Sequence, residues 1–200
     1  MALTALAMLA TPAAAMPATQ QLVDTILARA DNAGLPFLVI DKAGAEVLAY
    51  TADGTLRGTT PALLGRGHGD ISPPGIGDKP LATIAPADRI TPAGRFIASI
   101  GRDFHQDLLW IDYAAALSLH RVVTANAAER RLQRLATASV EDNRISFGCI
   151  NVPADYYDSI ILPLFTGTTG IVYILPEDGR TDTLLTPDTG SPRRIIESLK

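Results

Sequence analysis

Residues 58–94 are rich in glycine and proline and lie between short apolar segments. Both residue types interrupt helices and long strands, and both favour tight turns. The whole chain contains 16 Gly and 14 Pro among 200 residues, so these interruptions are not confined to one loop. Short segments joined by turns are typical of mainly β proteins and argue against a helical bundle. We therefore expect one mainly β domain with helices at its flank.

Short apolar runs mark the expected strands, and the residues between them have the composition of turns. We expect strands at residues 37–40, 46–51, 95–100, 108–113, 116–123 and 170–175. Apolar residues on one face after Thr19 predict a helix that ends at Asn32-Ala-Gly34, and Pro153 is placed to start another. Helix formers at 125–136 predict a third helix. Residues 58–94 are expected to form a long irregular segment.

The amino-terminal segment has the order of an export signal. No charged residue occurs from Met1 to Val23, and an apolar run ends in Pro12 and the small residues Ala13-Ala-Ala15, an A-x-A cleavage site. The run is too short to span a bilayer. We expect an exported protein of the periplasm or cell wall, with 1–15 as signal peptide and no stable membrane anchor. Because no positive charge precedes the run, a misplaced start codon or a buried helix is the alternative.

Charge and motif content argue against several functions. The net charge is −4 and no basic block occurs, so we expect no nucleic-acid partner. The glycine string at 65–69 is followed by Pro73 rather than by a helix, so it does not predict a phosphate-binding loop. His68, His105 and His120 are scattered and form no zinc motif. We expect no metal and no cofactor. Metal coordination by carboxylates that are far apart in the sequence is the alternative left open.

Cys149 is the best candidate nucleophile, and no other cysteine is present. A thiol with an ordinary pKa of about 8.5 needs a base to take its proton and donors to hold an oxyanion. Gly148 lets a carbonyl approach the backbone, and the amides of Gly148 and Cys149 are candidate donors. His120, at the end of an apolar segment, is the candidate base. From these residues alone, a lone cysteine is more often a small buried hydrophobe.

The segment Ser146-Phe-Gly-Cys-Ile-Asn151, with His120 upstream, resembles the motif of the L,D-transpeptidase (YkuD-type) family. That motif is a distant His followed by Ser/Thr-His-Gly-Cys, an apolar residue and Asn or Arg. Three further segments are similar to the family's opening hairpin, Thr-Pro-x-Gly-x-Phe segment and closing strand: 38–50, 90–96 and 170–174. The agreement covers residues 36–176, which would be the catalytic domain. Residues 16–35 would then form an N-terminal helix and 177–200 a C-terminal tail.

The resemblance implies an L,D-transpeptidase-type β-sandwich or open barrel with flanking helices, without a cofactor. It implies a peptidoglycan L,D-transpeptidase acting on stem peptides that end in diaminopimelate and D-alanine. His120 would deprotonate Cys149, the thiolate would attack the diaminopimelate carbonyl, and an amine would resolve the thioester. The backbone carbonyl of Arg121 would orient His120. The alternatives are an L,D-carboxypeptidase that hydrolyses the same stem and a non-catalytic wall-binding protein that keeps the fold.

By the same resemblance, Ser146, Phe147, Gly148 and Asn151 would contact substrate or surround the oxyanion. Local turn hydrogen bonds explain Ser146 and Asn151 equally well. Phe147 stands where the family usually has histidine. One contact with the stem would then be lost, and the acceptor or the product would differ.

Residues 121–145 separate His120 from Ser146 by more than the family usually shows. This gap contains the expected helix at 125–136 with four charged side chains, Glu129, Arg130, Arg131 and Arg134. We expect these side chains to form a solvated helix face. A lid or a partner-binding insertion is the alternative.

Overall fold

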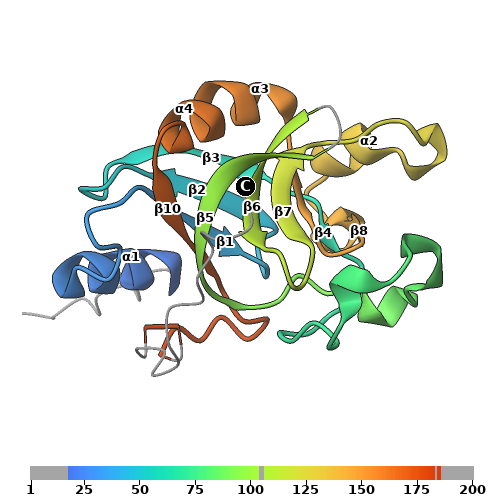
Figure 1. Cartoon of the computed structure of the whole chain (residues 1–200), viewed down its shortest axis with the longest axis horizontal. Coiled ribbons are helices and arrows are strands. Elements are labelled where there is room, and N and C mark those ends of the chain that lie inside the picture. The colour runs from blue at the N-terminus through green and yellow to red at the C-terminus, as the bar shows by residue number, and fades with distance from the viewer. Residues whose placement is uncertain (1–17, 104–105, 183, 186–200) are drawn as a thin grey trace, which may run out of the picture.

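The computed structural model describes residues 18–103, 106–182, 184 and 185, and it shows a mainly β fold. Eight strands form one curved sheet in the order β3-β2-β1-β10-β5-β6-β7-β9, and β4 pairs with β8 in a second sheet (Figure 1). The strands are β1 Phe37–Asp41, β2 Glu46–Tyr50, β3 Leu56–Pro61, β4 Leu64–Gly65, β5 Gly94–Asp103, β6 Gln106–Asp112, β7 Leu117–Arg121, β8 Arg144–Ser146, β9 Ile150–Val152 and β10 Thr169–Ile174. The expected class, a mainly β open barrel with flanking helices, is confirmed.

Two neighbouring pairs in the large sheet run parallel, and the other pairs run antiparallel. β1 is parallel to β10, and β7 is parallel to β9. The second pair positions the site, because it places His120 opposite Asn151 in the register. Parallel strands need a long crossover connection. Here residues 122–149 provide this connection. The segment between His120 and Cys149 therefore runs from the end of β7 to the start of β9, close to both residues.

Helices cover the sheet on two opposite sides (Figure 1). α1 spans Ala18–Arg29 and α2 spans Arg131–Leu135. A helix follows Pro153 as expected, with Pro153 as its N-cap and not its first residue. The continuous helical run contains α3 Ala154–Tyr156, the π-helical turn η6 Tyr157–Ile161 and α4 Leu162–Phe165. The 3-10 turns are η1 Ile76–Asp78, η2 Leu81–Thr83, η3 Pro86–Asp88, η4 Ala127–Glu129 and η5 Glu141–Asn143.

β1 is buried on both faces, and its alternate residues enter two apolar cores. Leu38 and Ile40 belong to the first core, which also takes apolar side chains from β7, β9 and the α3–α4 run. Phe37 and Val39 belong to the second core, which α1 enters through its buried residues, Leu22 among them. The sheet is therefore stabilised from both sides, and the strands that carry the motif residues rest on the first core.

Several expected element boundaries are wrong. β5 continues through Gly101-Arg-Asp103, which we expected to be a turn, because the glycine leaves room for the neighbouring Trp110: a Cβ at Gly101 would lie 2.7 Å from Trp110 Cδ1. Residues 58–94 are not wholly irregular, since they contain β4 and most of β3. The helix expected at 125–136 is split into η4 and α2, because Arg130 between them has φ 50°, a left-handed conformation that interrupts a helix.

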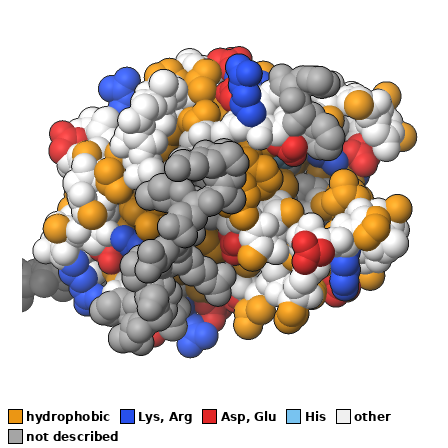
Figure 2. Space-filling model, in the orientation of Figure 1, with side chains coloured by type: hydrophobic (Ala, Val, Ile, Leu, Met, Phe, Trp, Pro, Cys, Tyr) orange, Lys and Arg blue, Asp and Glu red, His pale blue; other side chains and the backbone are white. Residues whose placement is uncertain are grey.

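The described helices include none that is long and apolar enough to cross a membrane. The expected signal peptide and its cleavage site, and also His105, lie outside the described residues. On the face shown in Figure 2, the described Lys and Arg side chains lie apart from one another and form no basic patch.

Candidate active site

Cys149 lies in the tight turn that joins β8 to β9. Ser146 closes this turn, because its Oγ donates a hydrogen bond to the carbonyl of Cys149 (2.6 Å) and accepts one from the amide of Gly148 (3.0 Å). Gly148 has φ 129°, and a Cβ there would lie 2.8 Å from the carbonyl oxygen of Ile90. The turn therefore requires glycine next to Cys149.

Thr91 ties the same turn to the rest of the fold. Its buried Oγ1 donates a hydrogen bond to the carbonyl of Gly148 (2.7 Å) and accepts one from the amide of Gly65 (2.8 Å). One hydroxyl group thus joins β4, the segment before β5 and the turn that carries Cys149. Thr91 belongs to the 90–96 segment, for which the sequence indicated a resemblance but no role.

His120 is positioned by β7, whose alternate residues face opposite sides of the sheet. Leu117 and Leu119 lie in the first core, so Ser118 and His120 share the other face. The carbonyl of Arg121 accepts a hydrogen bond from His120 Nδ1 at 2.7 Å. Because a carbonyl can only accept, this bond holds the proton of a neutral imidazole on Nδ1 and leaves Nε2 able to take a second proton.

The thiol of Cys149 is half-buried, and its sulfur lies 3.5 Å from Ser118 Oγ and 3.4 Å from the carbonyl oxygen of Ala116. Burial works to raise the pKa of Cys149, but the hydrogen bond with His120 and the charge of His120 outweigh burial and lower it. Burial also works to lower the pKa of His120, but the interaction with Cys149 and the Arg121 carbonyl raise it. Both shifts work in the direction of a thiolate beside an imidazolium, the reactive form of a cysteine nucleophile.

One expected oxyanion donor is already engaged inside the turn. The amide of Gly148 donates its hydrogen bond to Ser146 Oγ, so the expectation that this amide faces a developing oxyanion is wrong for this structure. A backbone N–H supplies one proton, and the Ser146 bond uses it. Of the two expected donors, the amide of Cys149 remains.

Phe147 has a partner of its own beside the nucleophile. The guanidinium of Arg89 stacks over its ring, 3.9 Å from the ring centroid. Arg89 is held in place by hydrogen bonds from Nε (3.1 Å) and Nη2 (3.0 Å) to the carbonyl of Ile84. A cation–π contact therefore takes the position where the family motif has an imidazole.

The side chain of Arg121 points away from the sulfur into an ion-pair cluster. Its Nε donates to Asp158 Oδ1 (2.9 Å), and its Nη1 donates to Asp107 Oδ1 (3.3 Å). The guanidinium also lies 4.3 Å from the centroid of the Tyr157 ring. Arg121 thus contributes its backbone carbonyl to the site, while its side chain anchors the end of β7 to the helix η6.

The crossover segment reaches the site through Arg131, which corrects the expected solvated helix face. Arg131 Nη1 donates a hydrogen bond to Asn151 Oδ1 (2.7 Å), and Asn151 Nδ2 donates one to the carbonyl of Cys149 (3.3 Å). The side chain of Arg131 is only 11% exposed, whereas Arg130 is exposed. The expectation is wrong for Arg131 because the buried amide oxygen of Asn151 needs a donor, and the guanidinium supplies it.

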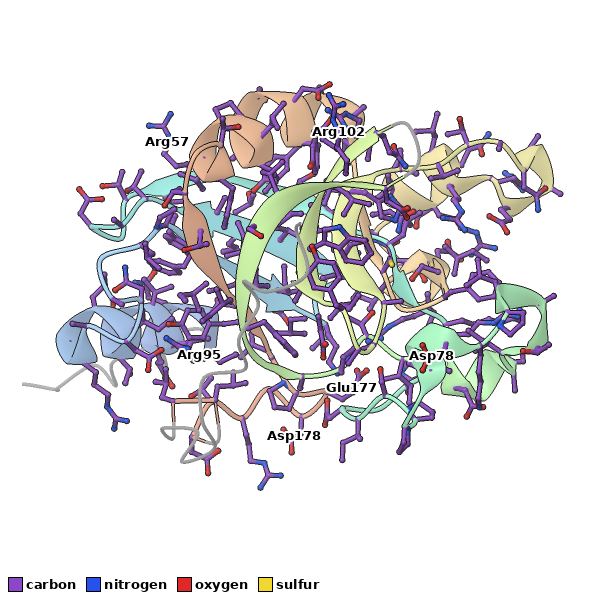
Figure 3. All side chains as sticks on the ribbon, in the orientation of Figure 1. Arg57, Asp78, Arg95, Arg102, Glu177 and Asp178 are labelled. Carbon is purple, nitrogen blue, oxygen red and sulfur yellow. The ribbon has the colours of Figure 1, made fainter. Side chains whose placement is uncertain are left out.

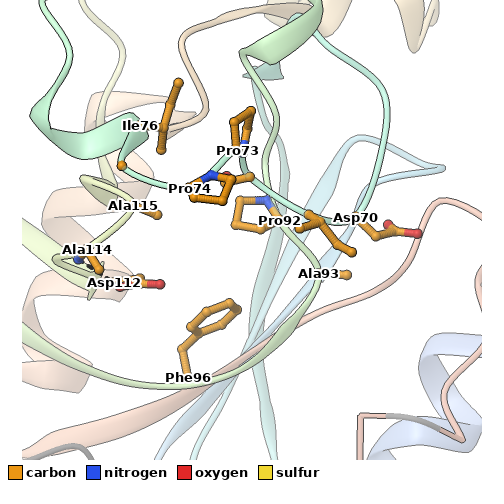
Figure 4. Close-up of a pocket in the computed structure, with 13 residues that line it drawn as sticks. Asp70, Pro73, Pro74, Ile76, Pro92, Ala93, Phe96, Asp112, Ala114 and Ala115 are labelled. Carbon is orange, nitrogen blue, oxygen red and sulfur yellow. Dashed lines mark hydrogen bonds between the residues drawn. The ribbon is translucent and has the colours of Figure 1, made fainter.

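An open pocket of about 410 Å³ adjoins the site (Figure 4). Prolines and the ring of Phe96 form much of its lining, and the β6–β7 turn forms one wall through Ala114 and Ala115. The next residue of that turn, Ala116, contacts the Cys149 sulfur. The β6–β7 turn therefore lies between the pocket and the nucleophile, and the mixed lining, which includes the carboxylates of Asp70 and Asp112, suits a peptide rather than a polyanion.

No model of a known protein family matches the sequence, and a comparison with curated proteins gives no match. Solved structures with a similar arrangement include the helical cell shape determining protein Pgp2 from Campylobacter jejuni (11% identity, TM-score 0.48, covering 72% of this chain and 48% of that chain). They also include the L,D-transpeptidase from Xylanimonas cellulosilytica (18% identity, TM-score 0.41, covering 70% and 60%) and the C442S mutant of Enterococcus faecium L,D-transpeptidase (16%, 0.36, 70% and 49%).

The chain spans about half the length of the Pgp2 and Enterococcus faecium chains and 60% of the Xylanimonas cellulosilytica chain. These likenesses concern the fold alone, so the chemistry of the site is argued from its own residues.

The residues that the sequence singled out converge on one turn and two strands. Ser146 and Asn151 each donate a hydrogen bond to the carbonyl of Cys149, and His120 lies opposite Asn151 on β7. His68 lies apart, 3.5 Å from Glu141. Within the described part of the chain, no group of three or more His, Cys, Asp and Glu side chains is placed to hold a metal ion.

Proposed function

We propose that this protein is an exported cysteine acyltransferase, an L,D-transpeptidase, that acts on the stem peptides of peptidoglycan. The observation that carries the proposal is the arrangement around Cys149: a half-buried thiol, a neighbouring imidazole and a carbonyl that fixes the proton of that imidazole on Nδ1. A base and an orienting group of this kind are what a thiol needs to act as a nucleophile at neutral pH.

In the first half-reaction His120 Nε2 accepts the proton of Cys149, and the thiolate forms a bond to the carbonyl carbon of diaminopimelate. The carbonyl oxygen becomes an oxyanion, to which the amide of Cys149 can donate a hydrogen bond. When the intermediate collapses, the carbon–nitrogen bond breaks, and His120 returns the proton to the nitrogen of the leaving D-alanine. The product is a thioester on Cys149.

In the second half-reaction an amine of another stem attacks the thioester, and His120 takes the proton that this amine loses. The carbon–sulfur bond breaks, the thiolate is restored and the two stems are cross-linked. Water in place of the amine gives a shortened stem instead. The pocket lined by Ala114 and Ala115 offers room for part of a peptide ligand, and Ala116 in the same turn contacts the sulfur.

Mass spectrometry of a disaccharide-tetrapeptide incubated with the protein tests the proposal. We expect loss of D-alanine, together with a cross-linked dimer if an amine resolves the thioester or a tripeptide if water does. The Cys149→Ala variant should release none. Equal turnover by Cys149→Ala would contradict a cysteine mechanism, and no turnover by either folded protein would favour a wall-binding protein that keeps the fold.

Rapid labelling of Cys149 by a neutral alkylating reagent would argue against that second candidate. A purely structural buried cysteine labels slowly, whereas an activated thiolate labels quickly. Phe147 is the residue that favours the second candidate, because it replaces a polar group with an aromatic ring beside the nucleophile.

A further inference from the structure

The crossover between β7 and β9 brings a positioned guanidinium to the nucleophile turn. Arg131 is the first residue of α2, and it reaches Asn151, which in turn bonds the carbonyl of Cys149. Asn151 is buried and lies opposite His120 in the parallel register. Two hydrogen bonds therefore separate the guanidinium from the backbone of the nucleophile.

The orientation of the Arg131 guanidinium is fixed on one edge. Its Nε donates to Glu129 Oε2 (2.5 Å), and the backbone carbonyl of Glu129 accepts a bond from Arg134 Nε (2.8 Å). Nη1 binds Asn151. Among the described residues, no acceptor is bonded to Nη2 of Arg131, so this nitrogen can still donate to a ligand.

The other two arginines near Cys149 are engaged differently. Arg121 is held between the carboxylates of Asp107 and Asp158. Arg89 lies flat on the Phe147 ring and is bonded to a backbone carbonyl. The charge of Arg131 also works to lower the pKa of His120, although the net pKa of His120 is raised.

We propose that Arg131 binds the carboxylate of the donor stem next to the bond that Cys149 cleaves, and so restricts the enzyme to donors whose leaving group ends in a free carboxylate. This inference rests on the proposed function, because it names a specificity-determining residue for that reaction. A planar guanidinium held on one edge matches a carboxylate better than a mobile lysine would. A half-buried position strengthens the contact, since water competes less there.

Alkylation of Cys149 tests the anion site without any peptidoglycan substrate. The ratio of the labelling rate with iodoacetate to that with iodoacetamide compares an anionic with a neutral reagent at the same thiol. We expect Arg131→Met to lower this ratio about threefold or more relative to the parent, because it removes the guanidinium that attracts the carboxylate of the reagent. An unchanged ratio would overturn the proposal.

Two control variants separate a local contact from general effects. Arg130→Met removes an exposed cation directly before α2, and among the described residues its side chain bonds neither Glu129 nor Asn151. Arg57→Met removes an exposed cation from β3, far from α2 (Figure 3). Both should keep the parent's ratio, and a fall of the same size in either would contradict a specific role for Arg131.

Paired donors test the specificity itself. A stem ending in D-alanine is compared with the same stem ending in D-alanine amide. We expect the parent to prefer the acid by about tenfold or more in kcat/KM, and Arg131→Met to lose that preference through its rate on the acid alone. Arg131→Lys keeps the charge but not the planar pair of N–H donors. It should therefore retain the preference for iodoacetate and lose most of the preference for the acid stem over the amide stem.

The outcomes distinguish this inference from the proposed function. If the parent turns over neither donor, the proposed function fails, and the alkylation ratio still decides whether Arg131 forms an anion site. If the parent cleaves both donors and Arg131→Met keeps the parent's preference, Arg131 has no such role. Should Arg131→Met fail to fold, Arg131→Lys gives the donor comparison.

Discussion

At the scale of single residues, the reactivity of Cys149 depends on two opposing effects. Burial disfavours the thiolate, whereas the hydrogen bond and charge of His120 favour it, and the second effect is larger. His120 in turn depends on the carbonyl of Arg121 for its orientation. The lowered pKa of Cys149 is therefore a property of the pair, and removing either partner exposes the effect of burial on the other.

The pH dependence of alkylation checks this account, because Cys149 is the only thiol that can react. A lowered pKa means that the thiolate persists to lower pH, so the labelling rate should rise with pH below the value of about 8.5 for a free thiol. In His120→Gln only burial and Ser118 remain, and the rise should move to higher pH. Superimposable profiles for the two proteins would contradict the pairing.

Gly148→Ala is expected to damage the nucleophile turn. The residue has φ 129°, and the new Cβ would lie 2.8 Å from the Ile90 carbonyl. Backbone strain of this kind costs about 1–3 kcal/mol, so we expect a lower free energy of unfolding and slower labelling of Cys149. Gly179→Ala is the matched control, since Gly179 has φ 70° and no heavy atom within 4 Å of its Cβ position. Equal losses in the two variants would contradict a steric role for Ile90.

Residue types alone could indicate the chemistry but not its geometry. The sequence could predict Cys149, His120 and Gly148, because motif spacing and backbone freedom are local properties. Ser118 could have been found from β7, because it lies two residues before His120 on the same strand face. Arg131 and Thr91 could not, because their partners in the nucleophile turn are distant in the chain.

At the scale of elements, the site depends on how β4, the segment before β5 and the nucleophile turn are joined. Thr91→Val tests this junction with little change in side-chain shape. Loss of the hydroxyl leaves the amide of Gly65 and the carbonyl of Gly148 without a partner, at about 1–3 kcal/mol for each buried group. We expect a lower midpoint of thermal unfolding and slower alkylation of Cys149.

Thr59→Val is the control for that substitution. Thr59 is exposed on β3, where a β-branched residue is favoured with or without its hydroxyl. We expect its unfolding midpoint to stay within a few degrees of the parent's, in line with about 0.5 kcal/mol for a surface change. A loss in Thr59→Val as large as that in Thr91→Val would show that the hydroxyl of Thr91 is not what joins these elements.

The sequence could predict strands that are long apolar runs, but not short strands that form because of their neighbours in the sheet. β1 and β10 are apolar runs long enough to identify. β8 and β9 contain three residues each, too few to show a period, and they exist because β4 and β7 bond to them. The split of the 125–136 helix also depends on tertiary contacts, since helix propensity there favours a continuous helix.

At the scale of the whole molecule, the two cores make separate contributions. α1 contacts the second core through Leu22, which is fully buried, whereas the strands that carry Cys149 and His120 rest on the first core. Leu22→Ala should lower the free energy of unfolding by about 2–5 kcal/mol. Well below its unfolding midpoint, the variant should keep the parent's rate of Cys149 alkylation. A slower rate in the folded variant would show that the site depends on the second core as well.

The mass of the intact protein, measured after rapid mixing with a tetrapeptide donor and acid quenching, tests the central proposal most directly. The account predicts a covalent adduct on Cys149 whose mass equals the stem's acyl group without D-alanine, with D-alanine released in equal amount. Cys149→Ala should carry no adduct and release no D-alanine. D-alanine released at the parent's rate by Cys149→Ala, or a folded parent that forms no adduct and releases no D-alanine, would contradict it.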